Sequence, residues 1–103
     1  MERFAWKAVV LPGMLEEYKR RHDQIWPEMT ALLNEAGIHN YTIWNTGDEL
    51  FGYYECESVE KAGRVQAQSE AVRRWNESMK PLMRMVADGR EGGDGMVQVF
   101  YHP

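Results

Sequence analysis

HNYTIWNTGDELFGYYECE, residues 39–57, is the stretch that decides the fold. His39 to Thr46 and Glu49 to Glu57 both alternate between apolar and polar residues and are rich in residues that favour strands. The dipeptide Gly47-Asp48 between them is typical of a tight turn. The pattern therefore predicts an antiparallel β-hairpin in the middle of the chain.

Before the hairpin, the sequence predicts one strand and one helix. Phe4 to Leu11 is apolar, with β-branched and aromatic residues, and the following Pro-Gly pair ends it. From Met14 to Ala36 the apolar residues recur at steps of three and four, which is helical periodicity. Gly37 is placed to end this helix as a C-cap.

Pro27 interrupts the predicted helix. Its missing N–H leaves the carbonyl of Asp23 without a helical partner, and its ring disfavours helical geometry at Trp26. We therefore expect a kink or a break about one turn after His22. Such a break is either a tolerated bend or an opening through which a ligand reaches the inner face of the helix, and the sequence leaves both readings open.

A second helical region follows the hairpin. Ser58 is a suitable N-cap, and helical periodicity continues to Leu82, with a division into two helices at Gly63 or at Ser69-Glu70 as a further option.

The chain is then expected to end in a surface loop and a strand. Asp88 to Gly95 holds four glycines and four charged residues, which predicts the loop, and Met96 to Tyr101 reads as a closing strand. The predicted order β-α-β-β-α-β over residues 1–103 is that of a single α+β domain of the ferredoxin-like type, with helices on one face of an antiparallel sheet.

Such an arrangement leaves one face of the sheet uncovered. Alternating strand positions carry Trp6, Tyr41, Ile43, Tyr53 and Phe100, and so large an apolar face does not stay in water. It either binds a ligand or meets a second subunit, so we expect a homodimer of the dimeric α/β-barrel type.

Composition and charge exclude several classes of protein. With 12 Lys and Arg against 16 Asp and Glu, the net charge of −4 provides no basic surface for nucleic acid. The single Cys56 excludes an internal disulfide, and His22, His39 and His102 lack metal-ligand spacing, so we expect no metal. The sequence shows no signal peptide and no membrane-spanning stretch, which makes the cytoplasm the expected location.

Tyr18 and His22 are the residues most suggestive of chemistry. They are four apart, so they stack on one helical face, the face shared with the apolar positions. A histidine on such a face is either a core residue or a proton carrier. Imidazole suits the second role because its unperturbed pKa lies nearest neutrality, which allows it to give and take a proton at cytoplasmic pH.

Four segments together resemble the L-rhamnose mutarotase family over essentially the whole chain. The specific one is Glu16 to Glu28, with its Tyr-x-x-x-His and Trp-Pro; the others are His39-Asn40-Tyr41, Arg74-Trp75 and Val99-Phe100-Tyr101. The resemblance implies a ferredoxin-like dimer that equilibrates the α and β anomers of L-rhamnose without a cofactor.

The resemblance also implies roles for individual residues. His22 matches the family's proton donor, Tyr18 and Tyr41 match its substrate-contacting tyrosines, and Trp75 matches the first of a Trp-Trp pair that contacts the sugar. The second tryptophan is replaced here by Asn76. An amide forms hydrogen bonds where an indole offers a stacking face, so the sugar hydroxyls recognised could differ, and L-fucose is an alternative substrate.

Two further functions stay open at the level of the sequence. Fold analogy alone suggests a cofactor-free monooxygenase or a lactone isomerase, because dimeric ferredoxin-like domains host both. The other is a non-catalytic small-molecule binding dimer, in which His22 is only structural. A mutarotase needs neither a nucleophile nor a metal, only a pocket for the sugar and a proton carrier near its anomeric carbon and ring oxygen.

Overall fold

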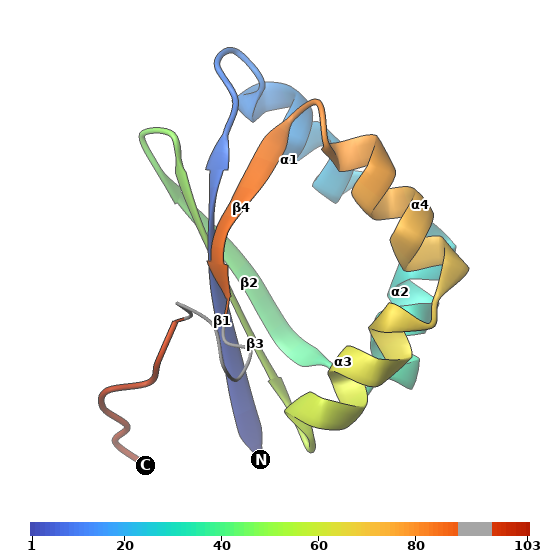
Figure 1. The fold of residues 1–103 in the computed structure, drawn as a ribbon, viewed down its shortest axis with the longest axis vertical. Coiled ribbons are helices and arrows are strands. Elements are labelled where there is room, and N and C mark those ends of the chain that lie inside the picture. Colours follow the sequence, from blue (N-terminus) through green and yellow to red (C-terminus); the bar gives the residue numbers. More distant parts are fainter. Residues whose placement is uncertain (89–95) are drawn as a thin grey trace.

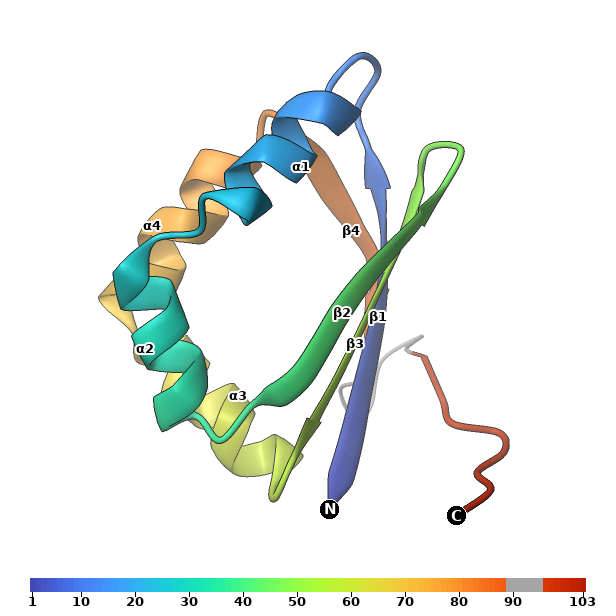
Figure 2. The same cartoon turned by 180° about the vertical axis from the view of Figure 1, so that it is seen from behind.

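A computed structural model describes residues 1–88 and 96–103. The elements in chain order are β1 (Glu2–Val10), α1 (Leu15–Asp23), α2 (Pro27–Glu35), β2 (His39–Thr46), β3 (Glu49–Cys56), α3 (Val59–Ala67), α4 (Glu70–Met79) and β4 (Met83–Asp88). The strands form one antiparallel sheet in the order β2-β3-β1-β4. The helices all cover the same face of this sheet (Figures 1 and 2). The predicted α+β, ferredoxin-like fold is confirmed.

The break predicted at Pro27 divides the first helical region into α1 and α2. α1 ends at Asp23, and Pro27 is the first residue of α2, where its missing N–H removes no helical hydrogen bond. Trp26 before it is extended, with φ −62° and ψ 137°, as the residue before a proline prefers.

Gly37 ends α2 as predicted and turns the chain into β2. It has φ 76°, a left-handed conformation that favours glycine. Its N–H donates to the carbonyl of Asn34 at 3.0 Å, and the N–H of Ile38 donates to that of Leu33 at 3.0 Å. These two bonds form a Schellman motif, which satisfies carbonyls at the end of the helix.

The central hairpin is confirmed, but its first strand is irregular. Gly47 in the turn has φ 59°, and the ladder between β2 and β3 shifts register between His39 and Thr42. Inside this bulge Asn40 has φ 50°, and its amide donates to Glu55 at 2.8 Å. A bulge of this kind re-aims the neighbouring side chains, here that of Tyr41.

The second helical region divides at Ser69 and not at Gly63, which lies within α3. The hydroxyl of Ser58 accepts from the N–H of Lys61 at 3.1 Å and begins α3, and that of Ser69 accepts from Val72 at 3.2 Å and begins α4. None of the helices formed by the described residues is long and apolar enough to span a membrane.

The closing strand is Met83–Asp88, so the prediction that placed it at Met96 to Tyr101 is wrong. β4 follows α4 after three residues, and the N–H of Leu11 donates to the carbonyl of Leu82 at 2.8 Å where β4 begins to pair with β1. The short connection brings β4 directly to the free edge of β1. Residues 96–103 are neither helix nor strand. Of the predicted loop, Asp88 ends β4, and 89–95 lie outside the described residues.

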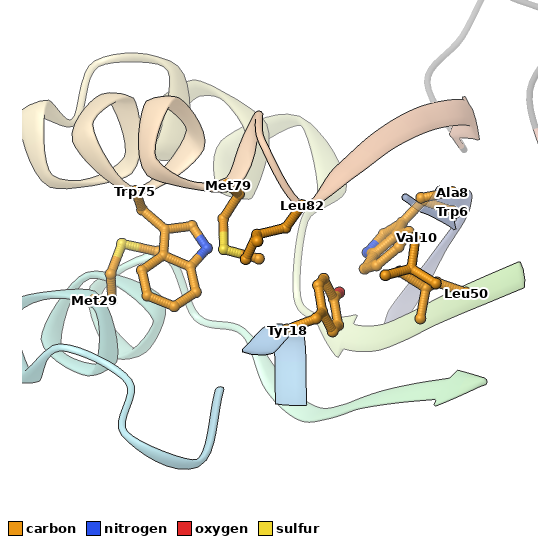
Figure 3. Packing of buried hydrophobic residues seen from close by; sticks show 9 residues of the cluster. All are labelled: Trp6, Ala8, Val10, Tyr18, Met29, Leu50, Trp75, Met79 and Leu82. Carbon is orange, nitrogen blue, oxygen red and sulfur yellow. The ribbon is translucent and has the colours of Figure 1, made fainter. Parts of the chain in front are cut away.

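The core lies between the helices and the sheet, and it corrects our expectation for the uncovered face. Trp6 is buried and points toward the helices, and Tyr41 and Ile43 pack against the same core. Of the strand residues expected on the uncovered face, only Tyr53 is there, because its neighbours along β3 are the buried ones. Figure 3 shows the main cluster: Trp6, Ala8, Val10, Tyr18, Met29, Leu50, Trp75, Met79 and Leu82.

Candidate active site

His22 lies in the last turn of α1, with its ring half-buried. Its Nδ1 is 2.9 Å from the backbone carbonyl oxygen of Tyr18. Because a carbonyl oxygen can only accept, Nδ1 carries the hydrogen and donates it. In the neutral ring this leaves Nε2 with an unshared electron pair, so His22 is held in the tautomer that can accept a proton at Nε2.

Two aromatic rings hold the imidazole in place. The ring of Tyr18 lies 4.4 Å from it, centroid to centroid, which confirms that the two side chains share one face of α1. The ring of Trp75 meets it edge-on at 5.3 Å from α4. The structure thus brings three of the predicted site residues into one cluster.

The Tyr18 side chain is buried, with 5% of the residue exposed, yet its hydroxyl makes no hydrogen bond within the described part of the chain. No fully buried side-chain nitrogen or oxygen among the described residues lacks a partner, so this hydroxyl borders space that solvent can reach. Burial raises the pKa of Tyr18, and nearby Tyr41 raises it further. The phenol therefore stays protonated at neutral pH and is available to a ligand.

Tyr41 reaches the same interior from β2. Its hydroxyl oxygen accepts a hydrogen bond of 2.9 Å from the indole Nε1 of Trp6, and its ring lies 5.2 Å from that of Tyr54. Burial raises the pKa of Tyr41 to about 12, although the hydrogen bond from Trp6 acts in the opposite direction. Tyr41 is thus a second protonated phenol.

Trp6 and Trp26 belong to this region, although the sequence did not single them out for the site. Trp26 meets the ring of Trp75 edge-on at 5.2 Å, and Trp6 bonds Tyr41. The available signals were the high number of tryptophans and the position of Trp26 beside the helix-breaking Pro27.

Asn76 does not join the cluster. It follows Trp75 on α4, but it is exposed while Trp75 is buried. Successive helical residues are about 100° apart, which turns Asn76 away from the interior.

A cavity of about 350 Å³ lies at the break between α1 and α2. It is lined by Arg20, Arg21, Gln24, Trp26, Trp75 and Ser78. Its volume falls within the range of about 300–1,000 Å³ that is typical of small-molecule sites. Of the predicted site residues Trp75 lines it, whereas Tyr18, His22 and Tyr41 do not. A larger hollow of about 550 Å³ beside Gly13 and Asp48 includes none of the predicted site residues.

Ion pairs hold the arginines at the mouth of this cavity. Glu17 accepts hydrogen bonds from Arg20 at 2.6 and 2.7 Å and from Arg21 at 2.9 Å. These bonds lower the pKa of Glu17 to about 2. Arg21 also donates to the backbone carbonyl of Ser78 at 2.6 Å, which joins α1 to α4. The single carboxylate of Glu17 compensates only one of the two positive charges, so the cavity is bordered by a net positive charge.

Comparison with known proteins gives the family. Residues 3–102 match the family model for L-rhamnose mutarotase. The chain is 42% identical over 104 residues to an L-rhamnose mutarotase of Bacillus subtilis, with 98% of each chain covered. It is 36% identical over 103 residues to one of Oceanobacillus iheyensis, again with 98% of each covered.

Solved structures agree in fold. The crystal structure of an L-rhamnose mutarotase from Formosa agariphila has a TM-score of 0.80 and 28% identity, with both chains fully covered. A dimeric ferredoxin-like protein from an uncultured marine organism has a TM-score of 0.68 at 18% identity, covering 99% of this chain and 100% of its own, and this likeness shows the fold alone. The chain belongs to the L-rhamnose mutarotase family and is an isomerase.

Proposed function

We propose that the protein interconverts the α and β anomers of L-rhamnose, with His22 as the residue that transfers the proton. The observation that carries this proposal is the 2.9 Å contact from Nδ1 of His22 to the Tyr18 carbonyl, which leaves Nε2 to accept a proton. Membership of the family supports the substrate and the reaction. Neither the monooxygenase nor the lactone isomerase alternative gains support from these relatives.

The reaction follows from one proton moving between two oxygens of the sugar. Nε2 of His22 takes the proton from the anomeric hydroxyl, the bond from the anomeric carbon to the ring oxygen breaks, and the ring oxygen takes the proton back from the imidazolium. The open-chain aldehyde rotates its carbonyl, and the same steps in reverse close the ring on the other face. Positioned acid–base catalysis of this kind contributes about 10²- to 10⁴-fold in rate.

The surrounding aromatic residues would bind the sugar. Tyr18 and Tyr41 are protonated phenols that can donate hydrogen bonds to sugar oxygens. Trp75 and Trp26 offer apolar surfaces for the C–H faces of the ring, and both line the cavity at the helix break. In this proposal, the break at Pro27 is the opening that admits the sugar.

The test is NMR measurement of exchange between the anomeric proton signals of L-rhamnose, with native protein, His22→Asn and His39→Asn. His39 is an exposed histidine on β2, so its variant is a matched control. We expect enhanced exchange with native protein and His39→Asn, and about 10²- to 10⁴-fold less with His22→Asn. No enhancement by native protein would contradict the mutarotase function and favour a binding protein. Full activity in His22→Asn would remove His22 from the mechanism.

The choice of sugar is tested in the same assay with L-fucose beside L-rhamnose. We propose L-rhamnose as the substrate, in accordance with the family. A role for Asn76 in sugar selection stays a prediction, and Asn76→Trp tests it by restoring the paired tryptophans. A change in the ratio of the two rates would support that role, whereas an unchanged ratio would agree with the exposed position of Asn76.

We also propose that a second copy of the chain covers the open face of the sheet. Trp44 on β2 is 69% exposed and Phe100 is 79% exposed. The Arg3 guanidinium lies 3.8 Å from the centroid of the Tyr101 ring, which places residues near the C-terminus on the side of the sheet opposite the helices (Figures 1 and 2). Sedimentation velocity should give a dimer that Trp44→Glu weakens; a native monomer at micromolar concentration would contradict this.

A further inference from the structure

Gly52 occupies a position in β3 where a glycine needs an explanation. It lies inside the strand, paired with Trp6 of β1, and its φ is not positive, so the backbone does not require glycine there. A glycine inside a strand weakens the strand and often marks a close approach by another group. A Cβ at this position would lie 2.0 Å from Cε2 and 2.2 Å from Nε1 of the Trp6 indole. The indole therefore lies directly over Gly52, in space that any side chain would occupy.

The indole placed in this way donates through Nε1 to the hydroxyl oxygen of Tyr41 at 2.9 Å. An indole N–H can only donate, so the Tyr41 oxygen accepts, and the hydroxyl hydrogen must point elsewhere. The ring of Tyr41 lies 5.2 Å from that of Tyr54, and the hydrogen bond from Trp6 fixes the position of its hydroxyl.

Tyr41 needs such a bond because it lies in the bulged part of β2. The register shifts between His39 and Thr42, and Asn40 has a left-handed backbone, so the regular alternation of a strand does not fix the direction of this side chain.

We propose that Trp6 and Gly52 are positioning residues that hold the Tyr41 hydroxyl as a hydrogen-bond donor to the sugar. The inference rests on the proposed function and adds why the Tyr41 hydroxyl donates a hydrogen bond to the sugar and does not accept one. Gly52 leaves room for the indole, the indole occupies a lone pair of the Tyr41 oxygen, and the remaining O–H is directed to an acceptor oxygen of the sugar. Trp6 acts through Tyr41 and not on the sugar itself.

The test is a double-mutant cycle in the anomer-exchange assay, with Trp6→Phe, Tyr41→Phe and the double variant. Trp6→Phe keeps an aromatic ring but removes the N–H, and we expect it to lower kcat/KM about 2- to 10-fold. Because Trp6 acts through Tyr41, it should cause little further loss in the Tyr41→Phe background. Lys61→Gln, at an exposed position of α3 outside both the site and the open face of the sheet, is the control and should keep native activity. Equal losses in both backgrounds, or none, would overturn the proposal.

Gly52→Ala and an NMR signal extend the test. Gly52→Ala should displace the indole and, if it folds, reproduce the loss of Trp6→Phe. The indole N–H resonance of Trp6 should shift in Tyr41→Phe, whether or not the protein acts on sugar. An unchanged resonance would overturn the positioning contact, whereas a native protein without anomer exchange would overturn the proposed function.

Discussion

Replacing glycine by alanine should have opposite effects at Gly37 and Gly63. Gly37 has φ 76°, whereas Gly63 lies inside α3, and a Cβ at either position meets nothing within 4 Å. Steric clash with the surroundings is therefore absent at both sites, and only the backbone conformation differs. Alanine at Gly37 enters the left-handed region and should destabilise by about 1 kcal/mol. Alanine at Gly63 improves helix propensity and should stabilise by about 0.5–1 kcal/mol.

Thermal unfolding at one fixed protein concentration measures this pair, and a fixed concentration matters because a dimer would make Tm depend on it. For a domain of about this size, 1 kcal/mol corresponds to about 4–8 °C in Tm. Gly37→Ala should therefore melt a few degrees below the native protein and Gly63→Ala a few degrees above it. Shifts in the same direction would refute the reasoning: two upward shifts would mean that the left-handed turn does not determine the response at Gly37, and two downward shifts would mean that helix propensity does not determine it at Gly63.

Three further predictions concern titratable groups. The pKa of Glu17, lowered from 4.5 to about 2, lies below its unfolded value, so its stabilisation is present above pH 4.5 and lost as the pH falls toward 2. Urea unfolding should accordingly find Glu17→Gln less stable than native protein at pH 7 and equal to it near pH 2. Nitrogen-15 NMR of neutral His22 should show the hydrogen on Nδ1; a hydrogen on Nε2 would contradict the contact with Tyr18. Burial raises the pKa of the Cys56 thiol, so thiol reagents should label it slowly until the chain unfolds.

Local signals in the sequence predicted most of the fold correctly. The Pro27 break, the Gly37 C-cap and the Gly47 turn each depend on one residue and its immediate neighbours, and the structure confirms all three. The closing strand depended instead on a choice between two apolar segments near the end of the sequence, which no single local residue decides. Residues 96–101 are more continuously apolar and aromatic, but Met83–Asp88 follows α4 directly and pairs with β1. The residue pattern of a segment does not show that a strand joined to the preceding helix by a short connection is favoured as its neighbour.

In the candidate site, too, contacts between residues close in sequence could be predicted, and a contact between distant residues could not. Tyr18 and His22 are one helical turn apart, so their shared face could be predicted from spacing, and their rings are in contact. The contact between Trp6 and Tyr41 spans 35 positions in sequence and depends on the register that pairs Trp6 with Gly52. Reading Trp6 on the uncovered face was wrong because the strand's two faces could not be told apart before the packing of the helices was known.

Gly52 shows what a sequence pattern omits at such a site. In the sequence it is a weak strand residue between Phe51 and Tyr53, and nothing in its neighbours explains it. In the structure the space that a side chain at position 52 would occupy is taken by the Trp6 indole from β1. The N–H of this indole donates to the hydroxyl of Tyr41 on β2. A residue without a side chain can therefore allow a polar contact between the two strands on either side of it. The donor that Tyr41 presents to the sugar in our proposal depends on the absence of a Cβ at position 52.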